Sequence, residues 1–231
     1  MNRIYTGAVL TIVAAADRDA NAGLAGVGSK LRSVSQTCET IQDLPLATKL
    51  PELSSLLWSS IWNSRAWTFQ EGLFSRKCLY STAHQVYFQC RQNIYREDII
   101  GEYSTVHGRM DPLEREIWVT EQAYGPKFNI YEAFIKMYSR RKLSYQSDIL
   151  NAFVGVKSAI RQRFGWKFTS APPEQCFDLA LLWRPMGKAQ PRFPVTEQFS
   201  SFPAWCWSPW VVDFICDPWQ FNSYAGNDIR L

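Results

Sequence analysis

The spacing of apolar and polar residues predicts a sheet made of short strands. Val9 to Ala16, "VLTIVAAA", is a continuous apolar run with β-branched residues, which is typical of a strand buried on both faces of a parallel or mixed sheet. Lys77 to Cys90, "KCLYSTAHQVYFQC", alternates with period two and predicts two strands, 77–82 and 84–90, paired as a hairpin. We expect Val9–Ala16 to be the central strand, with the hairpin beside it.

Apolar residues at helical spacing predict short helices after each of several loops. One helix holds Leu53, Leu56, Leu57, Ile61 and Trp62, and a second places Trp67, Gln70, Glu71 and Phe74 on one face, so that Trp67 should be largely buried. Further helices are predicted over 128–138, over 147–164 with an end before Gly165, and over 176–184. The segments 33–49 and 91–127 have no clear period, and we expect a surface excursion and a long loop.

Composition and charge narrow the class of protein. The chain has 231 residues, 46% of them apolar, which indicates a globular protein of one large or two small domains. The net charge is only +4 and the basic residues are scattered, so nucleic acid is not an expected partner. The six cysteines form no Cys-x-x-Cys pair and there are two histidines, so we expect no metal site. The sequence has no apolar stretch long enough to span a membrane. Together with the cysteine pattern, this predicts a cytoplasmic protein with reduced thiols.

Three local patterns suggest sites that their spacing does not support. In "GLAGVGSK", residues 23–30, serine precedes lysine, whereas a phosphate loop requires lysine directly after the second glycine, so a glycine-rich turn is the better interpretation. His84 and Cys90 on one extended strand would lie about 20 Å apart, too far for a catalytic dyad. The cluster Trp205, Trp207 and Trp210 could stack a ligand, but without neighbouring cations it is better explained as a core edge.

The stretch "RAWTFQE", residues 65–71, contains the one carboxylate that the pattern singles out. Trp67 and Glu71 lie one helical turn apart, so the indole could shield the carboxylate from water and raise its pKa for acid or base chemistry. Arg65 could equally neutralise Glu71 in an ion pair. No second catalytic group is visible nearby in the sequence, so the residues by themselves favour the structural interpretation.

Several stretches together resemble the fungal heterokaryon-incompatibility (HET) family. "IYTGAVLTIVAAADRDANAGLAGV" resembles the family's helix end, Thr-Ile-Val-Ala-Ala strand and glycine loop, and "WNSRAWTFQEGLFSRKCLY" resembles its next block. "YSRRKLSYQSDILNAFVGV" and "FPAWCWSPW" are similar to blocks found downstream in the same proteins. The resemblance implies a role in nonself recognition between hyphae and in the cell death that follows fusion.

The family's opening Leu-Ser-Tyr-x-Trp-Gly strand and its Trp-Ile-Asp-x-Leu-Cys-Ile-x-Gln segment do not occur in this chain. The resemblance therefore implies an N-terminally truncated form, with residues 1–95 as the C-terminal part of a HET domain and 96–231 as an associated region packed on it. An exposed sheet edge would then make self-association or a protein partner an expected property.

The HET family is also distantly similar to Toll/interleukin-receptor (TIR) domains, several of which cleave NAD with a glutamate four residues after a tryptophan. This similarity implies a catalytic Glu71 supported by Arg65, Trp67 and Gln70, with NAD as substrate and no bound cofactor. The expected fold is α+β, derived from an α/β sheet: a partial TIR-like sheet with helices, then a mixed helical and aromatic-rich C-terminal region. The alternatives are an incompatibility protein, a NAD-cleaving enzyme active only when complete, a pure interaction module and an inert remnant.

Overall fold

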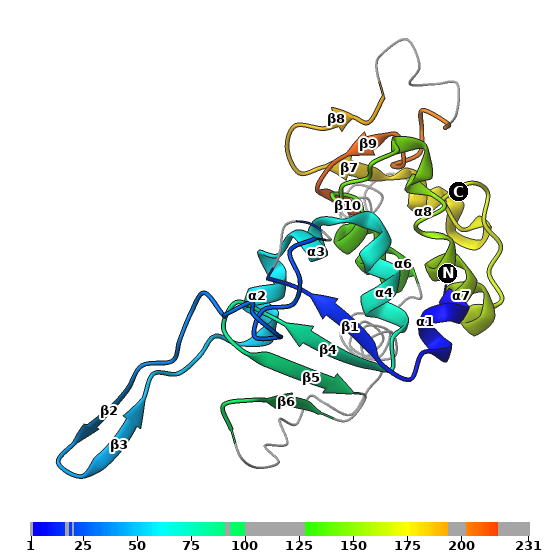
Figure 1. Ribbon diagram of the computed structural model, residues 1–231. Helices are drawn as coiled ribbons and strands as arrows, with labels where there is room; N and C mark the ends of the chain where they lie inside the picture. The colour runs from blue at the N-terminus through cyan, green and yellow to red at the C-terminus, as the bar shows by residue number, and fades with distance from the viewer. Residues whose placement is uncertain are drawn as a thin grey trace, which may run out of the picture. The chain divides into compact units, whose positions relative to one another are not determined.

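The computed structural model describes residues 2–16, 19, 21–90, 93–99, 128–193 and 202–216 (Figure 1). The chain divides into two compact units, Met1–Arg115 and Glu116–Leu231, here called the N-terminal and C-terminal units. Helices and mixed sheets are both present, which confirms the predicted α+β class. No helix within the described residues is both long and apolar enough to span a lipid bilayer.

The N-terminal unit is built on a four-stranded mixed sheet in the order β1-β4-β5-β6. The strands are β1 (Thr11–Ala14), β4 (Lys77–Ser81), β5 (Val86–Cys90) and β6 (Ile94–Arg96). β1 and β4 are parallel, and β4 and β5 form the predicted antiparallel hairpin. The expected central strand, however, lies at one end of this order and covers only four residues of the apolar run.

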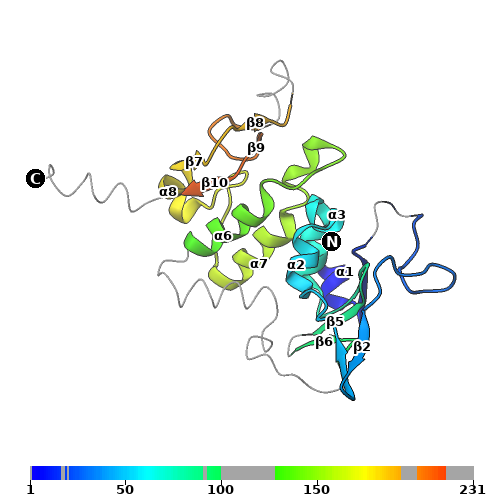
Figure 2. The ribbon, with the colours of Figure 1, turned by 90° about the vertical axis from the view of Figure 1, so that its left-hand side faces the viewer.

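The sheet has one face packed against helices, here called the inner face. Its buried residues are Val13, Cys78, Tyr80 and Tyr87, which cluster with Leu53 at the start of α2 (Leu53–Trp58). Trp62 of α3 (Ile61–Ser64) packs edge-on against Tyr80, with ring centroids 6.0 Å apart. Figure 2 shows α2 and α3 together on one side of the sheet. The prediction that β1 is buried on both faces is wrong, because Ile12 on the opposite face is 57% exposed.

The helix that carries Glu71 is α4 (Ala66–Phe74), and it contacts α1 (Asn2–Gly7). Gln70 and Phe74 of the predicted face are buried, whereas Trp67 and Glu71 lie at its flank. The full set of buried residues is Ala66, Thr68, Phe69, Gln70, Leu73 and Phe74. Trp67 lies at the flank of these buried residues and is mostly shielded from solvent, which agrees with the expectation that it is largely buried.

The predicted surface excursion contains a β-hairpin that the sequence pattern did not reveal. β2 (Cys38–Ile41) and β3 (Leu44–Ala47) pair antiparallel, with Ile41 opposite Leu44. The two turn residues, Gln42 and Asp43, both have positive φ, at 50° and 62°, as a type I′ turn requires. Every residue of both strands is exposed, and the hairpin projects away from the four-stranded sheet (Figure 1).

The C-terminal unit is mainly helical in its first half. α6 (Phe128–Tyr138) matches the predicted range 128–138, whereas the expected helix over 147–164 is divided into a 3-10 turn, Gln146–Ile149, and α7 (Val154–Phe164). Gly165 ends α7 in the left-handed conformation at φ 71°. The next predicted helix is shorter than expected: α8 (Phe177–Leu181) follows a 3-10 turn at Glu174–Cys176 and ends before the strand Trp183–Pro185. The predicted loop over 91–127 lies largely outside the described residues.

The aromatic tail of the C-terminal unit folds into two short strand pairs. β7 (Trp183–Pro185) pairs with β10 (Phe214–Cys216), and β8 (Gln190–Pro191) pairs with β9 (Trp210–Val211). Trp207 lies between β8 and β9 in the sequence and is 1% exposed. Its Nε1 atom donates a hydrogen bond to the Tyr131 hydroxyl over 3.1 Å. Trp205 is 40% exposed. Trp210 is half-buried. The tryptophan cluster therefore supplies one core residue, one half-buried residue and one surface residue rather than a uniform core edge.

Candidate functional site

A sharp joint between two helices positions Glu71. Ser60 caps α3 by accepting a hydrogen bond from the Asn63 amide over 3.1 Å. Arg65 then adopts an extended conformation, at φ −86° and ψ 140°, so it ends α3 and begins α4. The Thr68 hydroxyl donates to the carbonyl of Arg65 over 2.8 Å and holds the first turn of α4 in place. The joint turns α4 so that Glu71 lies beside Trp62 of the preceding helix.

Glu71 serves as a hydrogen-bond acceptor within the N-terminal unit. Trp62 donates from Nε1 to Glu71 Oε2 over 3.2 Å, and the Tyr5 hydroxyl of α1 also donates to this carboxylate. The Trp62 ring lies against the backbone beside Glu71, because a Cβ added to Gly72 would be 3.0 Å from its Cη2 atom. The half-buried carboxylate thus connects α1, α3 and α4.

The residues predicted to support Glu71 have different environments. Gln70 is fully buried, Trp67 is half-buried and Arg65 is exposed at the helix joint. Trp62 and Tyr5 both contact Glu71, and the sequence pattern does not indicate either of them as its partner. The sequence places Trp62 only in an apolar pattern of helical spacing and in the block that resembles the HET family, and Tyr5 is far away along the chain, so no local spacing indicates either contact.

Burial and Glu71 together shift the pKa of Tyr5. Burial is the largest cause and raises the pKa of Tyr5. The Glu71 carboxylate raises this pKa further, because it repels the phenolate and accepts a hydrogen bond from the phenol, and the resulting value is about 12. The ordinary value is 10.0. Between these two pH values the folded chain keeps a proton that the unfolded chain has lost.

We therefore expect Tyr5 to make stability depend on pH in the alkaline range. Its contribution is fully present below the unfolded pKa of 10.0 and is lost as the pH rises through about 12. Replacing Tyr5 by Phe should make the free energy of unfolding fall less steeply across this range. Urea unfolding at a series of alkaline pH values measures the difference, and parallel curves for the two proteins would contradict the assignment.

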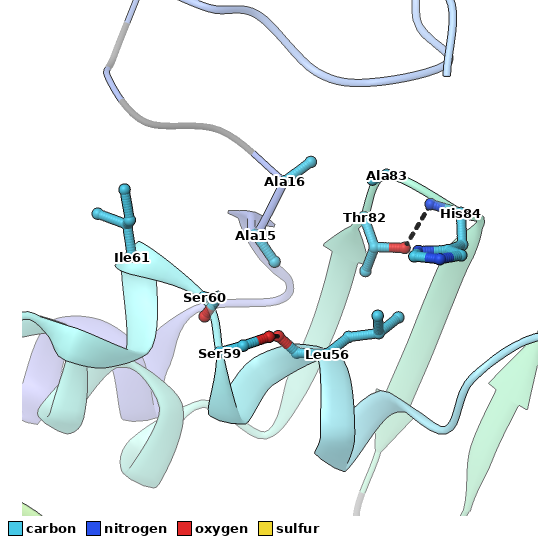
Figure 3. A pocket seen from close by; sticks show the side chains of 9 residues that line it. All are labelled: Ala15, Ala16, Leu56, Ser59, Ser60, Ile61, Thr82, Ala83 and His84. Carbon is cyan, nitrogen blue, oxygen red and sulfur yellow. Dashed lines mark hydrogen bonds between the residues drawn. The ribbon is translucent and has the colours of Figure 1, made fainter. Parts of the chain in front are cut away.

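A pocket lies at the carboxyl ends of the parallel strands β1 and β4 (Figure 3). Its volume is about 330 Å³, and its lining comes from the ends of both strands and from the α2–α3 joint: Ala15, Ala16, Leu56, Ser59, Ser60, Ile61, Thr82, Ala83 and His84. The carboxyl ends of parallel strands are where open α/β sheets bind ligands. Glu71 is not among the lining residues.

The polar groups of this pocket are mostly engaged with the protein itself. Ser60 Oγ donates to the carbonyl of Leu57 over 2.8 Å, and Thr82 Oγ1 donates to the carbonyl of Gln85 over 2.7 Å while it accepts from the His84 amide. His84 Nδ1 is buried and has no hydrogen-bond partner among the described residues. Among the lining side chains described, only that of His84 has a buried polar atom without a hydrogen-bond partner.

The glycine-rich loop after β1 adopts turns, as its sequence predicts, and covers the end of β4. Ser81 Oγ donates to the carbonyl of Ala25 over 3.1 Å, and Ala25 is buried. Gly26 has φ 81°, and a Cβ at this position would lie 2.8 Å from Nε of Arg32. Arg32 in turn pairs with Glu97, with its Nη2 atom 2.7 Å from Oε2. The loop thus positions the Arg32 guanidinium and is not arranged as a phosphate-binding loop.

Comparison with protein families identifies the N-terminal part of the chain. Residues 1–71 match the heterokaryon incompatibility protein (HET) family. The matched residues, here called the HET segment, include β1, the glycine-rich loop, the projecting hairpin and the candidate residues Arg65, Trp67, Gln70 and Glu71. This match confirms the resemblance to the HET family found in the sequence. No curated protein and no solved structure gives a significant match to the chain.

Proposed function

We propose that this chain acts in heterokaryon incompatibility, the nonself recognition between fungal hyphae that leads to cell death after fusion. The HET segment carries the proposal. We further propose that the chain acts by binding protein, as an interaction module, in the cytoplasm. Cys38, Cys78, Cys90, Cys176 and Cys206 are free thiols, which is in keeping with a reducing compartment.

The contacts of Glu71 favour a module over an enzyme. A carboxylate that stabilises a developing positive charge must face the reacting centre. Glu71 instead accepts hydrogen bonds from Trp62 and Tyr5, and the pocket at the carboxyl ends of β1 and β4 is lined by other residues. These contacts are those of a group that holds three helices together.

NAD cleavage is the second candidate function, and two observations favour it. Trp67 and Glu71 have the four-residue spacing of the TIR-like enzymes, and the pocket lies where such sites form. In this candidate Glu71 would stabilise an oxocarbenium-like ribose, with Arg65, Trp67 and Gln70 in support. The pocket volume of about 330 Å³ is at the lower end of the range for small-molecule sites, which extends to about 1,000 Å³.

Two substitutions at Glu71 distinguish an interaction module from a NAD-cleaving enzyme. Glutamine keeps an oxygen that can accept from Trp62 but removes the charge, whereas alanine removes both. We expect purified wild-type chain to release no nicotinamide from NAD. We also expect Glu71→Gln to unfold close to wild type, and Glu71→Ala to lose about 1–3 kcal/mol because the half-buried donors Trp62 and Tyr5 lose their acceptor.

These expectations are checked by nicotinamide release followed by chromatography and by urea unfolding. Nicotinamide release that disappears in Glu71→Gln would establish the enzyme instead. For the biological role, induced expression in fungal hyphae should cause death, scored with a vital dye, by wild type and by Glu71→Gln alike. Hyphae that survive both proteins would refute the proposed role in incompatibility.

A further inference from the structure

The projecting hairpin, residues 37–48, here called the arm, has one apolar face. In antiparallel pairing, directly opposed residues point to the same side. Ile41 and Leu44 are opposed, and so are Glu39 and Leu46. Ile41, Leu44 and Leu46 therefore share one face with Glu39, and they are 53%, 64% and 51% exposed. A two-stranded hairpin that packs on nothing is only marginally stable in water.

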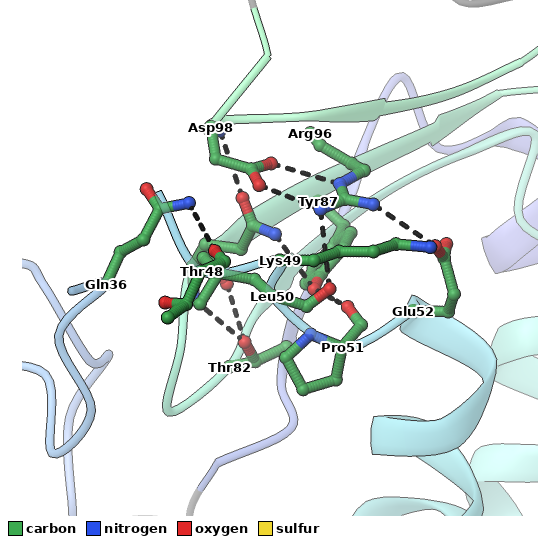
Figure 4. Close-up of polar contacts among 11 residues, drawn as sticks. Gln36, Thr48, Lys49, Leu50, Pro51, Glu52, Thr82, Tyr87, Arg96 and Asp98 are labelled. Atoms are coloured by element: carbon green, nitrogen blue, oxygen red, sulfur yellow. Dashed lines mark hydrogen bonds and ion pairs between the residues drawn. The ribbon is translucent and has the colours of Figure 1, made fainter. Parts of the chain in front are cut away.

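The root of the arm is tied to the sheet on both sides. On one side the Val34 amide donates to the carbonyl of Ala83 over 3.2 Å. On the other side Arg96 Nη2 donates to the carbonyl of Leu50 over 3.4 Å, and the Tyr87 hydroxyl donates to the carbonyl of Pro51 (Figure 4). These contacts direct the arm away from its own sheet, so its apolar face is not covered within the described part of the N-terminal unit.

The face of the sheet opposite the inner face, here called the outer face, is a second apolar surface. Pairing aligns Ile12 with Leu79, Leu79 with Phe88, and Phe88 with Tyr95, so one apolar row crosses all four strands. The Phe88 and Tyr95 rings contact each other, with centroids 5.9 Å apart. Ile12 is 57% exposed and the other three residues are half-buried. Parallel strands normally have both faces covered.

The arm and the outer face are complementary in charge and size. Segment 33–48 carries the acids Glu39 and Asp43 and no lysine or arginine. The outer face carries Lys77, two residues from Leu79 in β4. A row across four strands spans about 14 Å, and a four-residue strand is about 13 Å long. An acidic aliphatic surface and a basic apolar surface of equal extent thus occur on one chain.

We propose that two copies of this chain form a dimer by exchanging arms, each arm packing its Ile41–Leu44–Leu46 face on the outer face of the other copy's sheet. A two-fold axis makes the two contacts identical and closes the assembly at two chains. Glu39 of one copy then lies near Lys77 of the other. The arm and the sheet pack face to face at the spacing of stacked sheets, about 10 Å. This inference concerns self-association and does not depend on the role in incompatibility.

The test is the oligomeric state of the complete 231-residue chain, measured by sedimentation over a wide range of protein concentration. Wild type should be a concentration-dependent dimer. Leu44→Lys in the arm and Ile12→Lys on the outer face should each raise the dimer dissociation constant at least about tenfold, equivalent to about 1.4 kcal/mol. Leu31→Lys is the matched control, because Leu31 is 86% exposed and belongs to neither surface.

Mixing the two defective variants distinguishes arm exchange from other contacts. In a mixed dimer, the intact arm of the Ile12→Lys chain meets the intact outer face of the Leu44→Lys chain, so one of the two contacts is restored. Each variant alone has two defective contacts, whereas the mixed dimer has both substitutions in one contact, which either substitution by itself already disables. The mixture should therefore dimerise more strongly than either variant alone. A monomeric wild type, a dimer unaffected by either substitution, or a mixture no stronger than its components would each overturn the proposal. Circular dichroism confirms that the variants are folded, which is expected because both positions are more than half exposed.

Discussion

Replacing Trp207 by Ala should lower the free energy of unfolding of the C-terminal unit by about 3–5 kcal/mol, the usual cost of removing a buried aromatic side chain. Trp207 is 1% exposed and packs edge-on against Tyr138 and Phe153, with ring centroids 6.0 Å and 5.7 Å away. Truncation would leave a cavity between these rings. It would also remove the indole donor from the Tyr131 hydroxyl.

Trp205→Ala is the matched control. This side chain is 40% exposed, and its ring contact is with Phe177, at 5.2 Å. The ring pair adds about 0.5–1.5 kcal/mol beyond the area that it buries, and truncation of a partly exposed side chain leaves no closed cavity. The two tryptophans should therefore differ clearly in urea unfolding. Equal losses for both variants would show that the tryptophans form one continuous core. Small losses for both would favour a ligand-stacking surface.

Replacing Arg96 by Met should cost about 3 kcal/mol, near the lower end of the range for breaking a buried ion pair. Arg96 and Asp98 are 12% and 8% exposed, and Nη2 lies 2.7 Å from Oδ2. The substitution keeps most of the aliphatic stem but leaves Asp98 charged in a largely buried position. It also removes the hydrogen bond to the carbonyl of Leu50 that fixes the root of the arm (Figure 4).

The loss caused by Arg96→Met should depend on pH in a defined direction. The hydrogen bond from Arg96 holds the pKa of Asp98 below its ordinary value. The stabilisation is therefore present above that ordinary value and is lost as the pH falls through the lowered pKa. Wild type and Arg96→Met should converge in strong acid. Lys49→Met is the control, because Lys49 and Glu52 are 76% and 56% exposed and such a pair contributes at most about 1 kcal/mol. A difference that stays constant with pH would show that Asp98 is not the group involved.

Local sequence pattern was sufficient for elements whose signal lies within one stretch of chain. The alternation in 77–90 determined the hairpin of β4 and β5, and the helical period determined α6 at Phe128–Tyr138. The local pattern did not predict burial where burial depends on contacts with residues distant in the sequence. Ile12 and Val13 are equally apolar neighbours, yet Val13 meets α2 and is buried, while Ile12 lies on the exposed outer face.

The arm was missed because its strands have no apolar core of their own to impose a period. Its turn residues, Gln42 and Asp43, lack the glycine that usually marks a type I′ turn, and Pro45 argues against a strand. Only the anchoring of Leu50 and Pro51 by Arg96 and Tyr87, far along the chain, shows that the segment leaves the sheet as a hairpin.

For the candidate site, the sequence by itself determined the HET segment, the helix that bears Glu71 and the spacing of Glu71 from Trp67. The tertiary structure decided which groups Glu71 contacts. Helical spacing relates residues within about one turn, whereas the partners Trp62 and Tyr5 reach the carboxylate across a helix joint and from another helix. The outer face likewise exists only through the strand register, because four residues distant in sequence become one apolar row when the strands pair.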